Sequence, residues 1–269
     1  MEMQAWRDFL IPYDQAVQEL LVKFRNIQLE YKSLGQYSPI EQITGRVKSI
    51  HSILEKMGKR DIGYEDLEKE LSDIAGIRII CQFVEDIDSV VSLIRERKDM
   101  AIIEETNYVD NMKNSGYRSY HIVINYPVCT VLGTKTVRAE IQIRTMAMNF
   151  WATIEHSLQY KYQGHVPEEI QKRLKGSAEA CLHLDQEMSA IRNEITEAQG
   201  LFQERSQMVK DILSNVQSIY ANSEKIAMQE ARDQLFEMVR DGEFDKIKDF
   251  GAEIDAVAQH HGIQHLPPV

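Results

Sequence analysis

The segment EIQIRTMAMNFWATIEH, residues 140–156, alternates polar and apolar side chains and then passes directly into an aromatic-rich helical pattern. Successive side chains of a β-strand point to opposite faces, so Ile141 and Ile143 share one face. The carboxylate, amide and guanidinium side chains of Glu140, Gln142 and Arg144 share the other face. This pattern predicts a strand with one apolar face, and its polar face is either a functional site or the solvent-exposed side of an edge strand.

Four further strands and several helices are expected from hydrophobic periodicity. A β-branched run over Ile77–Phe83 predicts a central strand buried on both faces. The other strands are expected at residues 40–48, 100–106 and 119–128, the last forming a hairpin with residues 135–144. Helical patterns cover residues 6–34, 49–60, 64–71, 86–98 and everything after Thr145. The sequence therefore predicts an α/β fold of the α+β type, with a mixed sheet of about five strands, flanking helices and a helical C-terminal third.

We expect two domains in this chain. Residues 1–200 contain every candidate site residue described below. Residues 201–269 form an acidic helical extension, with 7 Lys and Arg against 12 Asp and Glu, to which the sequence assigns no role.

The net charge of −11 limits the partners of the protein. It argues against general nucleic-acid binding, which needs clustered positive charge, but it permits a small anionic substrate in a local basic pocket. The three cysteines form no CxxC pair, which indicates a reducing compartment and no zinc site. The sequence has neither a signal-peptide pattern nor an apolar run of about 18 residues, so we expect a cytoplasmic protein that does not bind membranes.

A cluster of cations is the first candidate site. The segment from residue 46 to residue 60 carries one anion, Glu55, and five cations: Arg46, Lys48, Lys56, Lys59 and Arg60. If the predicted strand and helix pack side by side, these cations converge on a pocket that suits a polyphosphate, because Arg binds phosphate oxygens through two N–H groups and Lys supplies a point charge. The alternative is the solvated face of a surface helix.

Two carboxylates are the second candidate site. Asp73 precedes the strand at Ile77–Phe83, and Glu140 lies inside an alternating strand. A charge beside a sheet interior needs a partner, and a Mg²⁺ ion that bridges two carboxylates and substrate phosphates would meet that need. The alternative is that each acid pairs with an arginine, Arg78 or Arg138.

The segment NSGYRSYH is the third candidate site. Gly116 indicates a tight turn that would leave the Tyr117 ring free to stack on a base, and His121 follows on the next strand. The alternative is that Tyr117 is an ordinary strand aromatic and His121 a hydrogen-bonded core residue. On the helix after residue 145, Asn149 and His156 could face the same site or pack in the core.

Four motifs, in this order, resemble those of one family: SPIEQITGRVKSIHSILEK, DIAGIRIICQF, SGYRSYH and EIQIRTMAMNFWATIEHSLQYKY. The chain resembles the small alarmone synthetases of the RelA/SpoT-homologue superfamily over residues 4–200, and in particular their homotetrameric subgroup. The resemblance implies a nucleotidyltransferase-like sheet and a Mg²⁺-dependent transfer of the β,γ-pyrophosphate of ATP to the 3′-hydroxyl of GTP or GDP. No hydrolase motif accompanies these segments, so we expect synthesis alone.

The resemblance also implies roles for individual residues. The ATP phosphates would be held by Arg46, Lys48, Lys56 and Lys59, and adenine would stack on Arg46 and Arg78. Asp73 would be the principal Mg²⁺ ligand, and Glu140 would assist the metal and act as the base on the 3′-hydroxyl. Tyr117 would stack on guanine, and the acceptor would be positioned by Lys113, His121, Gln142 and Asn149.

In the tetrameric subgroup, basic residues of the first helix line a central cleft where (p)ppGpp binds allosterically and single-stranded RNA competes. The corresponding residues here are Leu21, Arg25, Gln28, Gln42 and Thr44, of which only Arg25 is basic. We therefore expect activation by product and binding of single-stranded RNA to be weak or absent.

Two other functions are compatible with the residues. Toxin relatives of the family transfer pyrophosphate to other acceptors, such as adenine nucleotides or the 3′ end of tRNA. A non-catalytic scaffold that binds nucleotides or RNA is the other alternative, although the two carboxylates argue against it.

Overall fold

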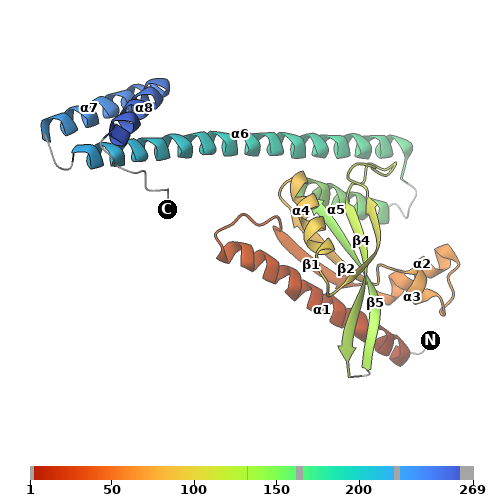
Figure 1. Ribbon diagram of the computed structural model, residues 1–269. Helices are drawn as coiled ribbons and strands as arrows, with labels where there is room; N and C mark the ends of the chain where they lie inside the picture. The colour runs from red at the N-terminus through yellow and green to blue at the C-terminus, as the bar shows by residue number, and fades with distance from the viewer. Residues whose placement is uncertain (1–2, 132, 162–165, 221–224, 261–269) are drawn as a thin grey trace. The chain divides into compact units, whose positions relative to one another are not determined.

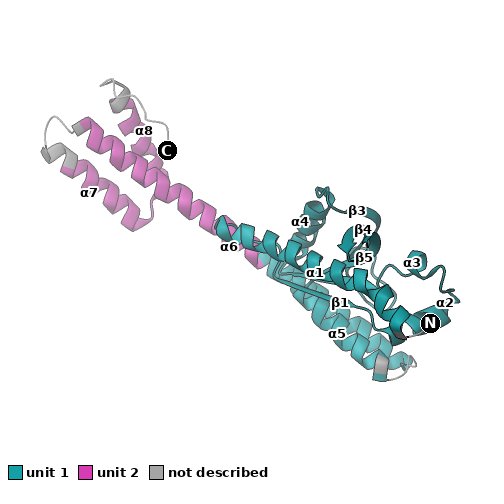
Figure 2. Ribbon diagram, turned by 90° about the horizontal axis from the view of Figure 1, so that it is seen from below, with its two compact units in different colours: residues 1–190 teal, residues 191–269 magenta. Residues whose placement is uncertain are grey.

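The computed structural model describes residues 3–131, 133–161, 166–220 and 225–260 (Figure 1). It divides the chain into two compact units, residues 1–190 and residues 191–269 (Figure 2). The helix α6 (Glu168–Tyr220) begins in the first unit and ends in the second. The domain boundary at residue 200, suggested by the sequence, also falls inside this helix and stays a prediction.

The first unit is built on a five-stranded mixed sheet with the strand order β1-β2-β5-β4-β3. The strands are β1 (Gln42–Val47), β2 (Ala75–Cys81), β3 (Ala101–Asn107), β4 (Tyr120–Thr130) and β5 (Gly133–Thr145). β2 and β5 run parallel, and the other neighbouring pairs are antiparallel. The predicted mixed sheet and the hairpin between its last two strands are confirmed.

One face of the sheet is apolar and packs against helix α1 (Met3–Ser33). The register places Ile77, Ile141 and Ile122 in one row across three strands, and all three are buried. On β1 the same row is occupied by Gly45, where a Cβ would lie only 2.8 Å from Val17 Cγ1 of α1. The missing side chain lets α1 approach the sheet closely.

The opposite face of the sheet is polar, which corrects one prediction. β2 was expected at Ile77–Phe83 with both faces buried, but it spans Ala75–Cys81, and Gly76 and Arg78 are only half-buried. Both residues line a cavity on the face that α1 does not cover. The isoleucines that alternate with them make the apolar side of the same strand.

Four shorter helices complete the first unit: α2 (Ile50–Arg60), α3 (Leu67–Glu70), α4 (Val84–Arg95) and α5 (Met146–Lys161). α2 is capped by the Ser49 side chain, which accepts a hydrogen bond from the Ser52 amide. The helix expected at residues 64–71 is reduced to the four residues of α3, because residues 64–66 form turns and the chain becomes extended at Leu71. α5 follows β5 without a gap, as the segment at residues 140–156 predicts.

The second unit has a hydrophobic core of its own. The end of α6 packs with α7 (Lys225–Asp241) and α8 (Phe244–His260). The buried residues are Ile212, Val216, Leu235, Ile247, Phe250 and Ile254. Among the described helices of both units, none is long and apolar enough to cross a membrane.

A buried carboxyl group joins α6 to the end of β5. Asp185 is 5% exposed, and its Oδ2 accepts a hydrogen bond of 2.7 Å from Thr145 Oγ1. Burial raises the pKa of Asp185 to about 6, although the Thr145 hydrogen bond opposes this shift; the Glu85 carboxylate adds to it. Protonated Asp185 therefore fits this buried contact between α6 and β5 better than the ionised form does.

We expect the stability of the first unit to depend on pH through Asp185. The pKa in the folded state lies above the ordinary value of 3.8, so this group favours folding below about pH 4, and the contribution is lost as the pH rises through about 6. Asp185→Asn places a neutral amide at the site and should raise the free energy of unfolding at neutral pH by on the order of 3 kcal/mol. Urea unfolding across this pH range measures the difference, which should vanish at acidic pH. A difference of the same size at every pH would contradict the prediction.

Candidate active site

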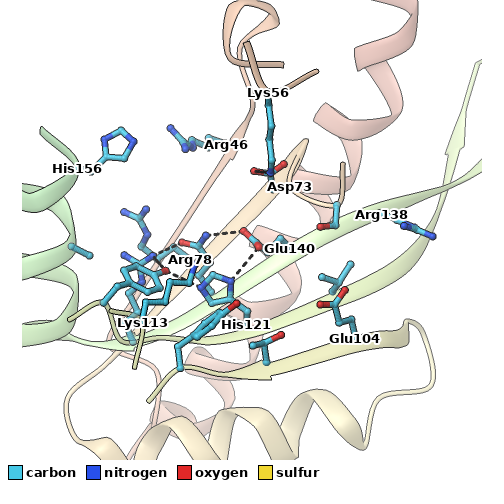
Figure 3. Close-up of a pocket in the computed structure, with 18 of the residues that line it drawn as sticks. Arg46, Lys56, Asp73, Arg78, Glu104, Lys113, His121, Arg138, Glu140 and His156 are labelled. Atoms are coloured by element: carbon cyan, nitrogen blue, oxygen red, sulfur yellow. Dashed lines mark hydrogen bonds and ion pairs between the residues drawn. The ribbon is translucent and has the colours of Figure 1, made fainter. Parts of the chain in front are cut away.

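The polar face of the sheet is the floor of a cavity of about 820 Å³ in the first unit (Figure 3). The strand register arranges its residues in rows. One row, from β1 to β3, consists of Arg46, Gly76, Glu140, Val123 and Glu104. The next row consists of Thr44, Arg78, Gln142, His121 and Thr106. Helix α5 adds Thr153, Glu155 and His156 as a wall.

Asp73, just before β2, is held by two lysines. Its Oδ2 lies 2.7 Å from Lys48 Nζ and 2.9 Å from Lys56 Nζ, and Figure 3 shows Lys56 descending onto this carboxylate. Its Oδ1 is buried and has no hydrogen-bond partner among the described residues. Burial raises the pKa of Asp73, but the hydrogen bonds from the two ammonium groups outweigh burial and lower it below its ordinary value. Asp73 is therefore an ionised carboxylate with one oxygen left for a ligand.

Glu140, in the middle of β5, is the second carboxylate. Its Oε2 accepts a hydrogen bond of 2.7 Å from Gln142 Nε2, and its Oε1 lies 3.2 Å from His121 Nδ1. Burial raises the pKa of Glu140, but the hydrogen bonds from these two side chains lower it below its ordinary value. Among the described residues, neither Asp73 nor Glu140 pairs with Arg78 or Arg138, so the pairing with arginine considered from the sequence is wrong.

A closed ring of hydrogen bonds connects Glu140 to a buried arginine. Arg144, 4% exposed, donates from Nη2 to Tyr117 Oη at 2.5 Å and to Gln142 Oε1 at 2.6 Å. Tyr117 Oη lies 2.8 Å from His121 Nε2, and His121 and Gln142 both reach Glu140. Each of these five side chains has two neighbours in the ring, which fixes its orientation before any substrate binds.

A tight turn places an aromatic side chain at the rim of the cavity. Gly116 has φ +94°, and a Cβ there would lie 2.7 Å from the Ala178 side chain, so only glycine fits this turn. Tyr117 follows the turn, and Lys113 Nζ lies 5.0 Å from its ring centroid and 4.4 Å from that of Tyr108. The predicted turn is confirmed, and Tyr117 lines the cavity with Lys113 and Tyr108.

The cavity carries an excess of positive charge. Eight basic and five acidic side chains line it. Burial lowers the pKa of Arg78, and the positive charges of Arg144 and Arg46 lower it further. The Nε atom of Arg78 is also buried without a hydrogen-bond partner among the described residues. A ligand with several negative charges would relieve this repulsion and supply the missing acceptor.

The structure brings most of the predicted site residues together. The cavity is lined by Arg46, Lys56, Asp73, Arg78, Lys113, Tyr117, His121, Glu140 and Gln142. Lys48 reaches the site through its hydrogen bond to Asp73. Arg60 and His156, which the sequence left open, also line the cavity.

Other predicted residues lie elsewhere. Lys59 Nζ is 2.6 Å from Glu55 Oε1 in an exposed pair one turn apart on α2, so the solvated-face interpretation describes this lysine. Asn149 lines a separate pocket with Gln42, and Arg25 is exposed on α1. Thr44 lies beside Arg46 in a slot at the edge of the main cavity.

Several residues that line the cavity have no role in the sequence-based prediction, and Arg144 and Tyr108 are two of them. A role for Arg144 could have been predicted, because the alternation of EIQIR already places it on the face of Glu140 and Gln142. Tyr108 could not, because its position against Lys113 depends on how residues 108–118 fold.

Known proteins match the part of the chain that builds this cavity. The family model described as "Region found in RelA / SpoT proteins" matches residues 45–165. GTP pyrophosphokinase YjbM of Bacillus subtilis is 52% identical over 202 residues, which cover 75% of this chain and 95% of that protein.

Two solved structures have the same fold. A GTP pyrophosphokinase family protein from Streptococcus pneumoniae is 55% identical with a TM-score of 0.70, over 75% of this chain and 98% of the other. Small alarmone synthetase 1 from Bacillus subtilis, bound to its product pppGpp, is 52% identical with a TM-score of 0.69, over 71% of this chain and 98% of the other. The chain therefore belongs to the small alarmone synthetases of the RelA/SpoT family.

Proposed function

We propose that this protein is a GTP pyrophosphokinase, which transfers the β,γ-pyrophosphate of ATP to the 3′-hydroxyl of GTP or GDP and releases AMP. The products are pppGpp and ppGpp, the alarmones of the stringent response. The observation that carries this proposal is the pair of ionised carboxylates, Asp73 and Glu140, on the floor of a cationic cavity of about 820 Å³. That volume lies near the upper end of the range for small-molecule sites, which suits two nucleotides.

The donor phosphates would lie at the end of the cavity lined by Arg46, Lys56 and Arg78. These cations would neutralise the charge of the transferring group, which is the main requirement of phosphoryl-type transfer. Lys48 is close enough to contribute through Asp73, whereas Lys59 would first have to leave Glu55. Stacking of adenine on Arg46 and Arg78 stays part of the proposal.

Glu140 would act as the base. Its carboxylate would take the proton of the 3′-hydroxyl as the oxygen attacks the β-phosphorus of ATP, and the bond from that phosphorus to the α,β-bridging oxygen would break to release AMP. The low pKa keeps Glu140 deprotonated before the reaction, and His121 and Gln142 hold it in place. Tyr117 and Lys113 would contact the acceptor nucleotide. Asn149 would have to act from its separate pocket.

The carboxylates also fit a Mg²⁺ ion. The Oδ1 atom of Asp73 is buried without a partner among the described residues, and the charge of Asp73 acts on Glu140. We propose that these two side chains hold the ion together with substrate phosphates, since Mg²⁺ prefers one or two carboxylates plus phosphate oxygens. When bound, the ion would neutralise charge on the transferring pyrophosphate.

We expect AMP release to identify both the activity and the acceptor. With ATP, Mg²⁺ and either GTP or GDP, the protein should form AMP and the 3′-pyrophosphorylated guanosine nucleotide, which chromatography separates. ADP in place of GDP should give no product, and EDTA should abolish turnover. Absence of AMP under all conditions would indicate a scaffold, and a product with ADP would indicate a toxin-type acceptor.

We expect Glu140→Gln to lower kcat by about 10²- to 10⁴-fold, the usual contribution of a general base, while binding of the ATP analogue AMPCPP changes only a few-fold. Glu105→Gln is the matched control, because Glu105 on β3 pairs with Arg95 at 2.6 Å and does not line the cavity. Initial rates and calorimetry give the two quantities. Near-normal synthesis by Glu140→Gln would show that another group is the base.

We propose that the enzyme acts in the cytoplasm as a homotetramer and that its product regulates it little. Leu21 is buried in the core, and Gln28 Nε2 donates to the backbone carbonyls of Ile40 and Glu41. Of the positions considered from the sequence, only Arg25 offers an exposed cation.

We therefore expect added pppGpp to change the initial rate by less than about twofold, an effect too small for a typical allosteric coupling free energy. Initial rates measured with increasing pppGpp at fixed ATP and GDP test this. A several-fold rise in rate would contradict it.

A further inference from the structure

Gly76 lies inside β2, where a glycine weakens a strand unless something approaches the backbone closely. We propose that Gly76 is a specificity-determining residue whose missing side chain makes room for the donor nucleotide. The inference rests on the proposed pyrophosphokinase function and adds to it a residue that touches ATP through its backbone.

Neither the backbone conformation nor the packing around residue 76 requires a glycine at this position. The φ angle of Gly76 is not in the left-handed region, since the positive-φ glycines are others. A Cβ built at Gly76 has Arg46 O as its nearest atom, at 3.7 Å, which is ordinary van der Waals contact. An alanine would therefore fit the folded chain without strain.

Gly45, on the neighbouring strand, is a glycine that the packing of the protein requires. A Cβ at Gly45 would lie 2.8 Å from Val17 Cγ1 and 2.9 Å from Ile77 Cδ1, so helix α1 excludes a side chain there. Gly45 pairs with Ile77 on the apolar face, whereas Gly76 pairs with Arg46 in the polar row. The missing side chains of the two glycines thus leave room on opposite faces of the sheet, although the backbone of Gly45 also borders the slot next to Gly76.

The space above Gly76 is a slot that joins the main cavity. The slot measures about 240 Å³, and the residues that it shares with the larger cavity are Arg46, Asp73, Arg78, Glu140 and Gln142. Gly76 lies between Arg46 and Glu140 in the register. The two guanidinium groups of the slot, Arg46 and Arg78, form no ion pair among the described residues.

This combination identifies the occupant as part of the donor. Guanidinium groups bind phosphates and stack on planar bases, and both are parts of a nucleotide. Asp73, with its open oxygen, borders the same slot, so the occupant lies beside the proposed metal and its phosphates. A methyl group at position 76 would project between Arg46 and Glu140 and take space from that occupant.

The test compares Gly76→Ala and Gly76→Val with Gly45→Ala, and uses Gly63→Ala as a neutral control because a Cβ at Gly63 meets no atom within 4 Å. Gly76→Ala should keep the wild-type Tm or exceed it. Its KM for ATP and its Kd for AMPCPP, measured without acceptor, should rise about tenfold or more, the usual effect of one misplaced methyl group in a site. Gly76→Val should raise them further, and the KM for GDP should stay within about twofold.

Gly45→Ala should lower the Tm, because its Cβ would lie 2.8 Å from Val17 Cγ1. The backbone of Gly45 borders the slot, so Gly63→Ala is the control for the KM for ATP. If Gly76→Ala keeps wild-type affinity for AMPCPP, raises the KM for GDP instead, or loses Tm as Gly45→Ala does, the inference is overturned. AMPCPP binding needs no turnover, so this result is separate from the proposed reaction, which fails only if the wild-type enzyme forms no AMP.

Discussion

The parallel pairing of β2 with β5 is the constraint on which the rest of the first unit depends. It sets Ile77 beside Ile141 on the face that α1 covers, and it sets Gly76 beside Glu140 on the face that holds the cavity. A slip of one residue would exchange the two faces, burying Glu140 under α1 and exposing the isoleucines. The hydrophobic core and the active site are therefore specified by the same strand register.

Some charged side chains of the cavity face an opposite charge, and others lack a partner in the described part of the chain before a ligand binds. Asp73 is satisfied on one oxygen by two lysines, whereas Arg78 is buried beside other cations and lacks an acceptor among the described residues. Before substrate binds, the buried charge without a partner raises the free energy of the site. Nucleotide phosphates would supply an acceptor for Arg78, and a cation would bind the open oxygen of Asp73. Both together favour binding of the donor as a complete polyphosphate.

The sequence predicted the faces of the sheet better than the neighbours of individual side chains. Alternation in one strand suffices to separate Glu140 from Ile141, because side-chain direction in a strand is local. Lys59 and Asn149 do not line the cavity, because a helix offers several faces and only tertiary packing decides which face meets the cavity. The raised pKa of Asp185 could not be predicted from the sequence either, because its burial depends on where α6 meets β5.

The hydrogen bonds in the ring around Glu140 all donate in one direction, from Arg144 toward Glu140. Arginine can only donate, so Tyr117 Oη accepts from Arg144, and its single O–H remains for His121 Nε2. In the tautomer that accepts this bond, His121 carries its proton on Nδ1 and donates it to Glu140 Oε1. Gln142 accepts from Arg144 through Oε1 and donates to Glu140 through Nε2. Both paths of hydrogen bonds, one through Tyr117 and His121 and the other through Gln142, run from the Arg144 cation to the Glu140 carboxylate. In the proposed reaction, a proton taken up by Glu140 would meet hydrogen-bond donors on both sides, so it would leave toward the cavity with product or solvent.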